Sequence, residues 1–446
     1  MKEVDLGALK IIENLRSAGY IGFLAGGCVR DGLLGLKPKD WDIATNASPE
    51  QVASIFEQTL LVGEKFGSCV VVLSEDSYDV TTFRNDGPYL DKRHPAYIEI
   101  SSPKQDALRR DFTINGLSYD PIKLELIDYV GGLRDLEERK LRCIGTPENR
   151  FNEDPLRLLR AVRFAAKFKL VWDPATFGAV KICSQEIESV SPERLENELS
   201  SILGLHQNCE ALKVLMKTGL MDLLLPEVAE LRGVTQPLEF HPEGDVWNHT
   251  LKLMSFLNNS SIELRWAALL HDIGKKSTRT FTDRIRFVGH EKVGAKMAEK
   301  ICDRFRMSNF RKDRIVSLIV NHMRLLNVRE MRESTRRRLF RRDYFEELLE
   351  LHRLDCLGGL GKLDIYDYCK NTLESLSQNK LKPPRVLSGR DLIELGIRPG
   401  PELGVILKKI EDAQLEDVIC NKRQAFEWIR SNCPGIINDC GDYNSI

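Results

Sequence analysis

The stretch FLAGGCVRDGLLGLKPKDWDIATNASPEQV, residues 23–52, carries the pattern that decides the fold of the N-terminal part of this chain. It predicts a short strand ending in two glycines over 20–27, a short helix over 28–35 and a strand over 40–45. A further helix is expected over 48–56, with a Ser-Pro pair at its start as N-cap and first turn. Strands that alternate with helices in this way indicate a domain of mixed α and β structure.

Two carboxylates, Asp40 and Asp42, stand two residues apart in the expected strand 40–45. Residues i and i+2 of a strand project from the same face, so these side chains are expected to converge. Converging carboxylates repel each other unless a cation lies between them, and Mg²⁺ is the hard cation that carboxylates and phosphates hold together. A D-x-D pair alone more often marks a surface loop, so its neighbours decide between these interpretations.

A glycine pair, Gly26 and Gly27, lies directly before the expected helix 28–35. Glycine lets backbone N–H groups approach a phosphate closely, and Arg30 in the first turn offers a guanidinium to a phosphate oxygen. The alternative is a tight strand-to-helix turn that needs glycine for backbone reasons alone. Together with the paired carboxylates a few residues further on, this arrangement favours a phosphate site.

Five motifs, in this order, resemble those of class II tRNA nucleotidyltransferases and bacterial poly(A) polymerases, which belong to the DNA polymerase β superfamily. They are FLAGGCVRDGLLGLKPKDWDIATNASPEQV (23–52), RRDFTINGLSYDP (109–121), DYVGGLRDL (128–136), EDPLRLLRAVRF (153–164) and PERLENEL (192–199). The resemblance covers roughly the first half of the chain. It implies a small mixed-sheet nucleotidyltransferase head followed by an all-helical neck.

The resemblance also implies roles for individual residues. In such enzymes two carboxylates bind two metal ions that activate the RNA 3′-hydroxyl and stabilise the leaving pyrophosphate, and this role falls to Asp40 and Asp42. Asp79 is a possible third carboxylate, with a surface aspartate at a strand end as an equal alternative. Arg110 is expected at ribose and phosphates, or else in an exposed ion pair at a helix start. The implied nucleotide-binding set is Gly27, Arg30, Arg110, Asp154, Arg157, Arg160 and Arg163.

A helix is expected over 151–169, on which Asp154 and Arg157 would share one face at i and i+3. An aspartate accepts a hydrogen bond from an exocyclic amine and an arginine donates two parallel bonds, so the pair matches the polar edges of cytosine and adenine. The family uses such a pair as a protein template in place of a nucleic acid. Without the resemblance, the residues predict only a surface salt bridge. Arg163 would lie roughly opposite Asp154, near a phosphate or a neighbouring element.

Two segments bear on the choice of substrate. TTFRNDGPYLDKRHP (81–95) is expected to form a long loop between strands, and in the family a loop here is associated with addition of the terminal A. Its presence argues against an enzyme that adds only C. In LLVGEKFGSCVVVL (60–73), Glu64 stands where a poly(A) polymerase is expected to carry a second basic residue, which favours tRNA.

In the second half, VWNHT, LLHDIGKK, GHEKVGA and LHRLDCLG resemble an HD metal-dependent phosphohydrolase domain. Six of the eight histidines lie within 241–352, which favours a real site over scattered core histidines. Histidine and aspartate together suit a divalent transition metal. His290 and His322 are candidates for a second metal, with helix capping as the alternative, and the domain could also serve only for packing. The H…HD…D ligands implied by the resemblance are His249, His271, Asp272 and Asp355.

Composition is that of a globular chain. The 446 residues carry a net charge of −1, with 42% apolar and 29% charged residues, and no apolar run reaches the ~20 residues of a membrane helix. The N-terminus lacks the layout of a signal peptide, so a cytoplasmic protein with reduced, scattered cysteines is expected. The arginine-rich segment REMRESTRRRLFRR (329–342) is either a solvated helix face or a contact with an RNA backbone.

Changes of pattern divide the chain into an expected head over 1–140, a helical neck with RNA-binding region over 141–235, an HD domain over 236–360 and a helical C-terminal region over 361–446. The expected fold class is α+β. The expected activity is template-independent addition or repair of the 3′-terminal CCA of tRNA from CTP and ATP with Mg²⁺, without membrane or obligate protein partner. The alternatives are an A-adding-only enzyme or a poly(A) polymerase of the same family. From another class, an HD phosphohydrolase with an RNA-binding head is opposed by the intact D-x-D pair.

Overall fold

The computed structural model describes residues 4–63, 66–89, 92, 95–239, 241–281 and 283–433. The chain divides into two compact units, Met1–Glu230 with Ile301–Met307, and Leu231–Lys300 with Ser308–Ile446. The finer division into four parts stays a prediction. Glu64, on which the distinction from poly(A) polymerases rests, lies outside the described residues.

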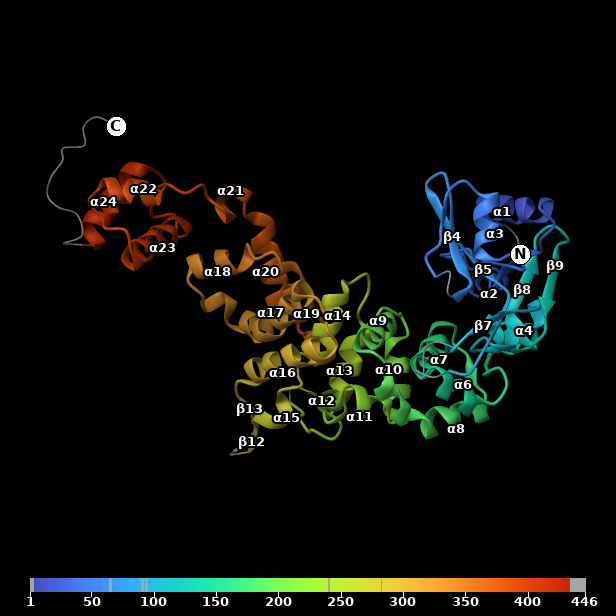
Figure 1. Cartoon of the computed structure of the whole chain (residues 1–446). Coiled ribbons are helices and arrows are strands. Elements are labelled where there is room, and N and C mark those ends of the chain that lie inside the picture. The colour runs from blue at the N-terminus through green and yellow to red at the C-terminus, as the bar shows by residue number, and fades with distance from the viewer. Residues whose placement is uncertain are drawn as a thin grey trace. The chain divides into compact units, whose positions relative to one another are not determined.

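A seven-stranded mixed sheet forms the N-terminal part of the first unit (Figure 1), with the strand order β3-β4-β5-β2-β1-β8-β9. The β2–β5 pair is parallel and the other five pairs are antiparallel. The strands are β1 (Gly22–Ala25), β2 (Ile43–Thr45), β3 (Thr59–Leu60), β4 (Ser68–Leu73), β5 (Asp76–Thr82), β8 (Leu117–Asp120) and β9 (Glu125–Asp128). This sheet, joined to a chain that is otherwise mainly helical, confirms the α+β fold class.

Short helices pack on this sheet because their apolar residues recur at helical spacing. In α1, four fully buried residues stand at i, i+3, i+4 and i+7 and contact β1 and β2. Ser48 caps α3 in a capping box with Gln51, and Pro49 begins the helix, as predicted. The helices of this region are α1 (Leu6–Ser17), α2 (Gly27–Leu33), α3 (Pro49–Ile55), α4 (Pro103–Leu108), η2 (Thr113–Asn115) and α5 (Gly132–Glu137).

The prediction of a long loop over 81–95 is wrong for the first residues of this segment. β5 continues to Thr82, and β6 (Arg84–Asp86) pairs antiparallel with β7 (Ile98–Ile100). Residues 84–86 form a strand because their backbone groups find partners more than ten residues further along the chain, which local polarity does not reveal. Residues 90, 91, 93 and 94 of this segment lie outside the described residues.

The rest of the first unit is helical, with one short strand pair, β10 (Lys140–Leu141) and β11 (Val171–Trp172). The single helix expected over 151–169 is wrong. The chain leaves the helix at Asp154, where φ is −146° and ψ is 99°, because Pro155 disfavours helical backbone in the residue before it. The helices are α6 (Pro147–Glu153), α7 (Leu156–Lys167), α8 (Pro174–Ile182), η3 (Ser184–Ser189), α9 (Pro192–Leu203), α10 (Asn208–Lys217), α11 (Leu220–Leu224) and α12 (Pro226–Ala229).

The second unit is built from helices and one hairpin, β12 (Arg279–Phe281) and β13 (Ile285–Phe287). Among the helices of the described residues, none is long and apolar enough to cross a membrane. The helices are α13 (Val246–Ser255), α14 (Ile262–Leu270), α15 (Lys275–Thr278), α16 (His290–Arg304), α17 (Asn309–Asn321), η4 (His322–Glu330), α18 (Glu333–Phe340), α19 (Phe345–Gly358), α20 (Asp364–Ser375), α21 (Gln378–Leu381), α22 (Gly389–Glu394), α23 (Pro401–Leu415) and α24 (Lys422–Asn432).

The middle of the arginine-rich segment 329–342 forms α18, which packs against α23. Arg338 pairs with Glu411 and Asp412, and Arg341 pairs with Glu411. Arg337, only 5% exposed, pairs with Asp417 just after α23. These arginines therefore hold the C-terminal helices in place. Neither expected role, a solvated helix face or a contact with an RNA backbone, describes them. The C-terminal helices have a small apolar core of their own, which includes Leu392, Ile410 and Ile429.

We expect the contact between α18 and α23 to depend on charge. Arg338→Glu should increase hydrogen–deuterium exchange in α23, because it places a third acid beside Glu411 and Asp412. Adding Asp412→Arg should restore part of the protection, and wild-type protection should fall as salt rises. Arg423→Glu is the control, because Arg423 and its partner Glu427 are both exposed and lie on one helix, α24. Unchanged exchange in Arg338→Glu would contradict this electrostatic account.

Candidate functional site

A polar cavity of about 760 Å³ lies in the first unit, bounded by the β1–α2 turn, β2, β5, the segment after α4, α7 and α9. The residues predicted for the nucleotide site from widely separated motifs come together here. Those that line the cavity are Gly27, Arg30, Asp42, Arg110, Asp154, Arg157, Arg160 and Arg163. Asp40 is the one predicted head residue that does not line it.

The acidic end of this cavity is formed by Asp42 and Asp79. β2 begins only at Ile43, so Asp40 lies in a bend before it, and the expectation that both carboxylates share a strand face is wrong. Ile43 is in parallel register with Val80, which sets Asp42 level with Asp79. Burial raises the pKa of Asp42, and the nearby charges of Asp79 and Asp40 raise it further. This concentration of negative charge fits a divalent cation.

The β1–α2 turn requires glycine at position 26. Gly26 has φ +74°, and a Cβ there would lie 2.4 Å from Nη1 of Arg110. Arg110 donates hydrogen bonds to the Asn115 carbonyl at 3.2 Å and to Asp106 Oδ2 at 3.1 Å. The glycine turn therefore lets a guanidinium pack directly on the backbone, beside the acidic end of the cavity.

Arg30 is buried and already engaged. Its guanidinium donates to Asp31 Oδ1 at 2.6 and 2.8 Å and to the Asn115 side chain, and it lies 4.4 Å from the Phe168 ring centroid and 5.1 Å from that of Phe164. These contacts join α2 to η2 and α7. A contact of Arg30 with phosphate stays a prediction, and it would require some of these bonds to be exchanged.

Arg160 forms an ion pair with Asp111 across the cavity wall. Nε and Nη2 of Arg160 donate to Asp111 Oδ2 at 2.9 and 2.7 Å. Asp111 Oδ1 accepts from Asn115 Nδ2 and from the Phe112 backbone N–H. Burial alone would raise the pKa of Asp111, but Arg160 and Asn115 lower it to about 2. The pair fastens α7 to the segment that carries Arg110.

Asp154 and Arg157 line the cavity, and their only bond to each other is from the Arg157 backbone N–H to the Asp154 carbonyl, at 3.0 Å. Asp154 Oδ2 accepts from Arg194 Nη2 at 2.8 Å. Arg157 Nη1 donates to Glu153 Oε2 at 2.7 Å and to the Arg150 carbonyl at 3.0 Å. The structure therefore does not contain the i, i+3 salt bridge that the residues alone predicted, and each member of the pair has its own support.

Helix α9 contributes residues that the sequence reasoning missed. Arg194 binds Asp154, and Glu198 accepts from Arg163, whose guanidinium lies 4.5 Å from the Phe164 ring centroid. The expectation that Arg163 reaches a neighbouring element is confirmed. The sequence signal that could have found them is the PERLENEL motif (192–199). In this motif Arg194 and Glu198 are four residues apart, so they lie on one face of a helix.

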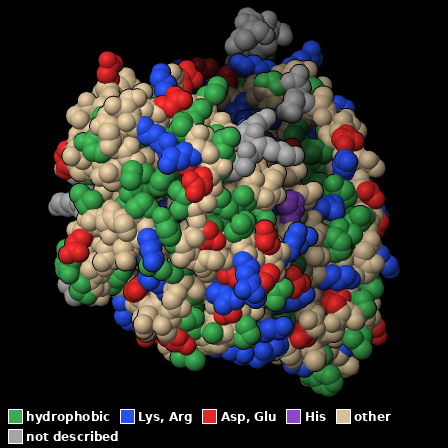
Figure 2. Space-filling view, turned by 90° about the vertical axis from the view of Figure 1, so that its right-hand side faces the viewer, with side chains coloured by type: hydrophobic (Ala, Val, Ile, Leu, Met, Phe, Trp, Pro, Cys, Tyr) green, Lys and Arg blue, Asp and Glu red, His purple; other side chains and the backbone are tan. Residues whose placement is uncertain are grey.

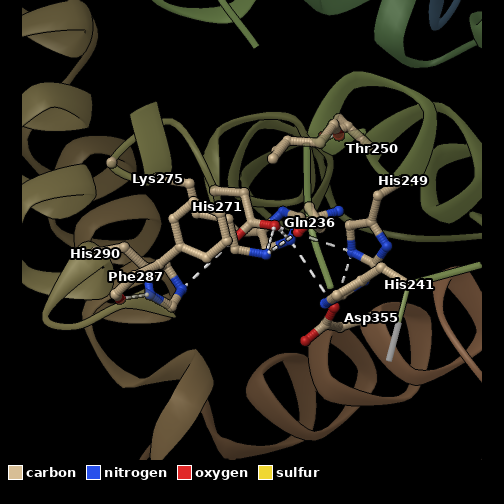
Figure 3. A network of polar contacts seen from close by, with 12 residues as sticks. Gln236, His241, His249, Thr250, His271, Lys275, Phe287, His290 and Asp355 are labelled. Atoms are coloured by element: carbon tan, nitrogen blue, oxygen red, sulfur yellow. Dashed lines mark hydrogen bonds and ion pairs between the residues drawn. The ribbon is translucent and has the colours of Figure 1, made fainter. Parts of the chain in front are cut away.

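The second candidate site lies in the second unit, beside a cavity of about 660 Å³. The predicted ligands converge there (Figure 3): His249 Nε2 lies 2.9 Å from Asp355 Oδ1, and His271 Nε2 lies 3.1 Å from Asp272 Oδ2. Among the described residues, three sets place their ligand atoms within 4.8 Å of one another, and two of these sets share His249. They are His249, His271 and Asp355, then Asp272, His290 and His322, and finally His241, Glu243 and His249.

Three of these histidines have the same orientation. Nδ1 of His271, His290 and His322 contacts the backbone carbonyl three residues earlier, at 2.9, 2.8 and 2.7 Å. The carbonyls belong to the last turns of α14 and α17 for His271 and His322 and to the end of β13 for His290, and all three rings still present Nε2 to the site. His271 Nε2 is buried and has no hydrogen-bond partner among the described residues. A metal ion fits such a set of ring nitrogens, because metal-binding histidines are typically held through the opposite nitrogen.

His249 is oriented by a carboxylate instead. Glu243 Oε1 lies 2.7 Å from its Nδ1 and 2.9 Å from Nδ1 of His241. Burial would lower the pKa of His249, but Asp355 and Glu243 raise it to about 9. A Cβ at Gly358 would lie 2.8 Å from Cε1 of His249, so this approach requires glycine. Glu243 lies in a turn-rich segment and gave no sequence signal beyond its place before His249.

Three family models match successive parts of the chain, in the order in which the motifs occur along the sequence. Residues 22–142 match the Poly A polymerase head domain, residues 171–231 match the probable RNA and SrmB-binding site of polymerase A, and residues 245–357 match the HD domain. The CCA-adding enzyme of Streptococcus gordonii is 32% identical, over 94% of this chain and 95% of that protein. The CCA-adding enzyme of Bacillus subtilis strain 168 is 30% identical, over 97% and 99%.

Solved structures agree with this assignment. The Bacillus stearothermophilus CCA-adding enzyme in complex with CTP has a TM-score of 0.74 at 26% identity and covers 95% of this chain and 97% of its own. The Thermotoga maritima CCA-adding enzyme, with a TM-score of 0.61 at 21% identity over 96% of both chains, shares the fold. The head and its polar cavity thus define a metal-dependent nucleotidyltransferase. This chain belongs to the family of CCA-adding enzymes.

We expect Asp111→Asn to lower the free energy of unfolding by about 2 kcal/mol near neutral pH, since the pKa of Asp111 falls from 3.8 to about 2 on folding. A carboxyl group whose pKa is lowered by folding stabilises the folded state at pH values above its unfolded-state pKa. This contribution is lost as the pH falls through the folded-state pKa. The difference from wild type should therefore shrink between about pH 4 and pH 2. Urea unfolding across this range checks it, with Glu210→Gln as control, because Glu210 is exposed and pairs with Lys213 on the same helix. A difference independent of pH would contradict the ion-pair account.

Proposed function

We propose that this chain adds the 3′-terminal CCA to tRNA from CTP and ATP, in the cytoplasm. The observation that carries the proposal is the single polar cavity that unites Asp42 with Asp154, Arg157 and the arginines between them. Support comes from the names of relatives that match along almost the whole chain and from the bound CTP of the Bacillus stearothermophilus enzyme. The four parts 1–140, 141–235, 236–360 and 361–446 would then act as head, neck, HD domain and C-terminal region.

In this proposal the acidic end of the cavity would hold Mg²⁺ through Asp42 and Asp40, with Asp79 as a third carboxylate. When bound, the metal ions activate the RNA 3′-hydroxyl and stabilise the leaving pyrophosphate. Arg110, held against Gly26, presents its guanidinium beside these carboxylates and would bind the triphosphate. The backbone of the glycine turn can approach a phosphate closely because it carries no Cβ.

Base selection would fall to Asp154 and Arg157 at the other side of the cavity. The Asp154 carboxylate accepts from an exocyclic amine, which cytosine and adenine carry, while the Arg157 guanidinium donates to a ring nitrogen or carbonyl. UTP and GTP would leave these groups unpaired. Arg160 and Arg163, bonded to Asp111 and Glu198, would shape the cavity wall around the nucleotide.

A direct experiment tests the proposal. Purified protein is incubated with Mg²⁺ and tRNA transcripts that end before CCA, after C or after CC, with labelled CTP or ATP. Addition of two C residues and then a single A is the expected result. Addition of A alone would make the chain an A-adding enzyme, and unlimited addition of A would make it a poly(A) polymerase.

We expect Asp42→Ala and Asp40→Ala each to abolish nucleotide addition, by on the order of a thousandfold, because metal ions contribute several kcal/mol to such transition states. Binding of tRNA should survive in both variants. Single-turnover addition at saturating Mg²⁺ measures the loss. Asp79→Ala is informative beside them, because a loss of similar size would place Asp79 at the metals. Substantial residual addition in Asp42→Ala would remove the metal assignment.

Asp154→Ala and Arg157→Ala should relax base choice more than they weaken triphosphate binding. A wrong base leaves each group unpaired, which costs about 1–3 kcal/mol, or roughly five- to a hundredfold in rate. The test is addition to tRNA ending in CC with each of the four triphosphates. If both variants keep wild-type preference for ATP over UTP and GTP, the pair does not select the base.

We propose metal-dependent phosphohydrolase activity as a second function, located at the HD site and separate from nucleotide addition. The favouring observation is the orientation of His271, His290 and His322, whose Nε2 atoms all face the site. A divalent transition metal suits this mixture of histidine and carboxylate. Asp272 belongs to one set of ligands, and its Oδ2 lies 3.1 Å from Nε2 of His271 in another. When bound, such a metal supplies an activated water for attack on phosphorus. His249 and Asp355 would complete its coordination.

Asp272→Ala should remove metal-dependent hydrolysis of a phosphodiester such as bis(p-nitrophenyl) phosphate and leave nucleotide addition intact. The physical reason is that Asp272 belongs to one ligand set, lies close to His271 of another and is absent from the cavity that contains Asp42. Hydrolysis with Mn²⁺, Ni²⁺ or Co²⁺ and addition to tRNA are measured on the same preparations. Loss of addition with an unchanged circular dichroism spectrum would mean that the two activities are not independent.

A further inference from the structure

Helix α9 carries two charged residues that bind residues of the nucleotide cavity. Arg194 and Glu198 are four residues apart, so they share one face of α9, and this helix packs on α7. Arg194 binds Asp154 and Glu198 binds Arg163, and Arg194 itself lines the cavity. α9 therefore contacts residues of the proposed base-recognition region without supplying the groups that would read the base.

The orientation of Asp154 depends on two donors. The backbone N–H of Leu156 donates to Oδ1 at 3.2 Å, and Arg194 Nη2 donates to Oδ2 at 2.8 Å. Asp154 lies between α6 and α7 with extended backbone angles, so regular helix geometry does not fix its side chain. The Asp154 side chain is 17% exposed and that of Arg194 23%, so solvent screens this pair less than a surface ion pair. Each carboxylate oxygen keeps a free lone pair for a further donor.

Arg157 is supported separately. It donates to Glu153 and to the Arg150 carbonyl, and no hydrogen bond or ion pair of Arg194 with Arg157 is found among the described residues. Removing the Arg194 guanidinium therefore takes away one of the two donors to Asp154 and leaves the contacts of Arg157 in place. The same holds for Arg110, whose partners are Asn115 and Asp106.

We propose that Arg194 is a positioning residue for base selection, which turns the Asp154 carboxylate so that its free lone pairs meet the exocyclic amine of the incoming base. This inference rests on the proposed role of Asp154. Without Arg194 the carboxylate rotates about its side-chain bonds, and the advantage of bases that carry an amine over bases that carry a carbonyl at that position falls. Triphosphate binding persists because the contacts of Arg110 are unchanged.

The experiment is single-nucleotide addition to tRNA ending in CC with ATP, GTP and UTP, in Arg194→Met, Arg194→Lys, Asp154→Ala and the double variant Asp154→Ala with Arg194→Met. Arg306→Met is the matched control, because Arg306 is 66% exposed and pairs with Glu193, the neighbour of Arg194 on α9. Arg194→Met should lower the kcat/KM ratio of ATP to GTP roughly tenfold or more, with a smaller change in KM for ATP. Arg194→Lys should recover part of the ratio, and Arg306→Met should keep it.

The double variant decides whether Arg194 acts through Asp154. Selectivity no lower than that of Asp154→Ala alone supports the inference, because a positioning residue has no effect once its target is gone. A further loss in the double variant overturns it, as does wild-type selectivity in Arg194→Met when Asp154→Ala has lost selectivity.

A raised KM of Arg194→Met for every triphosphate at unchanged selectivity also overturns the inference and makes Arg194 a phosphate contact. Unchanged selectivity in Asp154→Ala removes the proposed role of Asp154 itself. Circular dichroism and tRNA binding establish that each variant is folded.

Discussion

A chain of mostly buried polar side chains joins helix α7 to the head, and the nucleotide cavity depends on it. Arg160 binds Asp111, Asp111 accepts from Asn115, and Asn115 accepts from Arg30 on α2. Each group is costly to bury alone, so loss of one member leaves its neighbours unsatisfied. This interdependence holds the base-facing residues of α6 and α7 in a set position beside the glycine turn that would receive the phosphates.

The second site uses a different physical device. His271 and His322 stand at the ends of α14 and α17, where the backbone carbonyl three residues earlier engages one ring nitrogen and leaves the other directed inward. His249 lies on α13, His271 caps the end of α14, His290 begins α16 and Asp355 lies on α19, so these four helices meet at the ligands. Orientation by backbone carbonyls makes this site depend on helix packing more than on the identity of surrounding side chains.

Charge serves a third purpose in the C-terminal region. On the face drawn in Figure 2, basic side chains are interspersed with acidic and apolar ones, in keeping with a net charge of −1. At α18 the opposite charges form specific ion pairs. Arg338 pairs with Asp412 on α23, and Arg337 pairs with Asp417 just after α23. Many charges of this chain therefore act on one another within the fold, so an arginine-rich segment is not by itself evidence of RNA contact.

The sequence by itself determined the order of elements, the mixed sheet, the capped helix after Ser48 and the identity of most residues around both sites, because periodicity, capping and ordered motifs are local properties of the chain. It did not determine where strands and helices stop: β2 begins after Asp42, and Pro155 separates Asp154 from the helix of Arg157. Only the tertiary structure decided the partners of each charge, such as Arg194 for Asp154 and Glu243 for His249. A charged side chain pairs with whatever group packing brings within about 3 Å, and residues 40 positions apart in the chain leave no local pattern that foretells this.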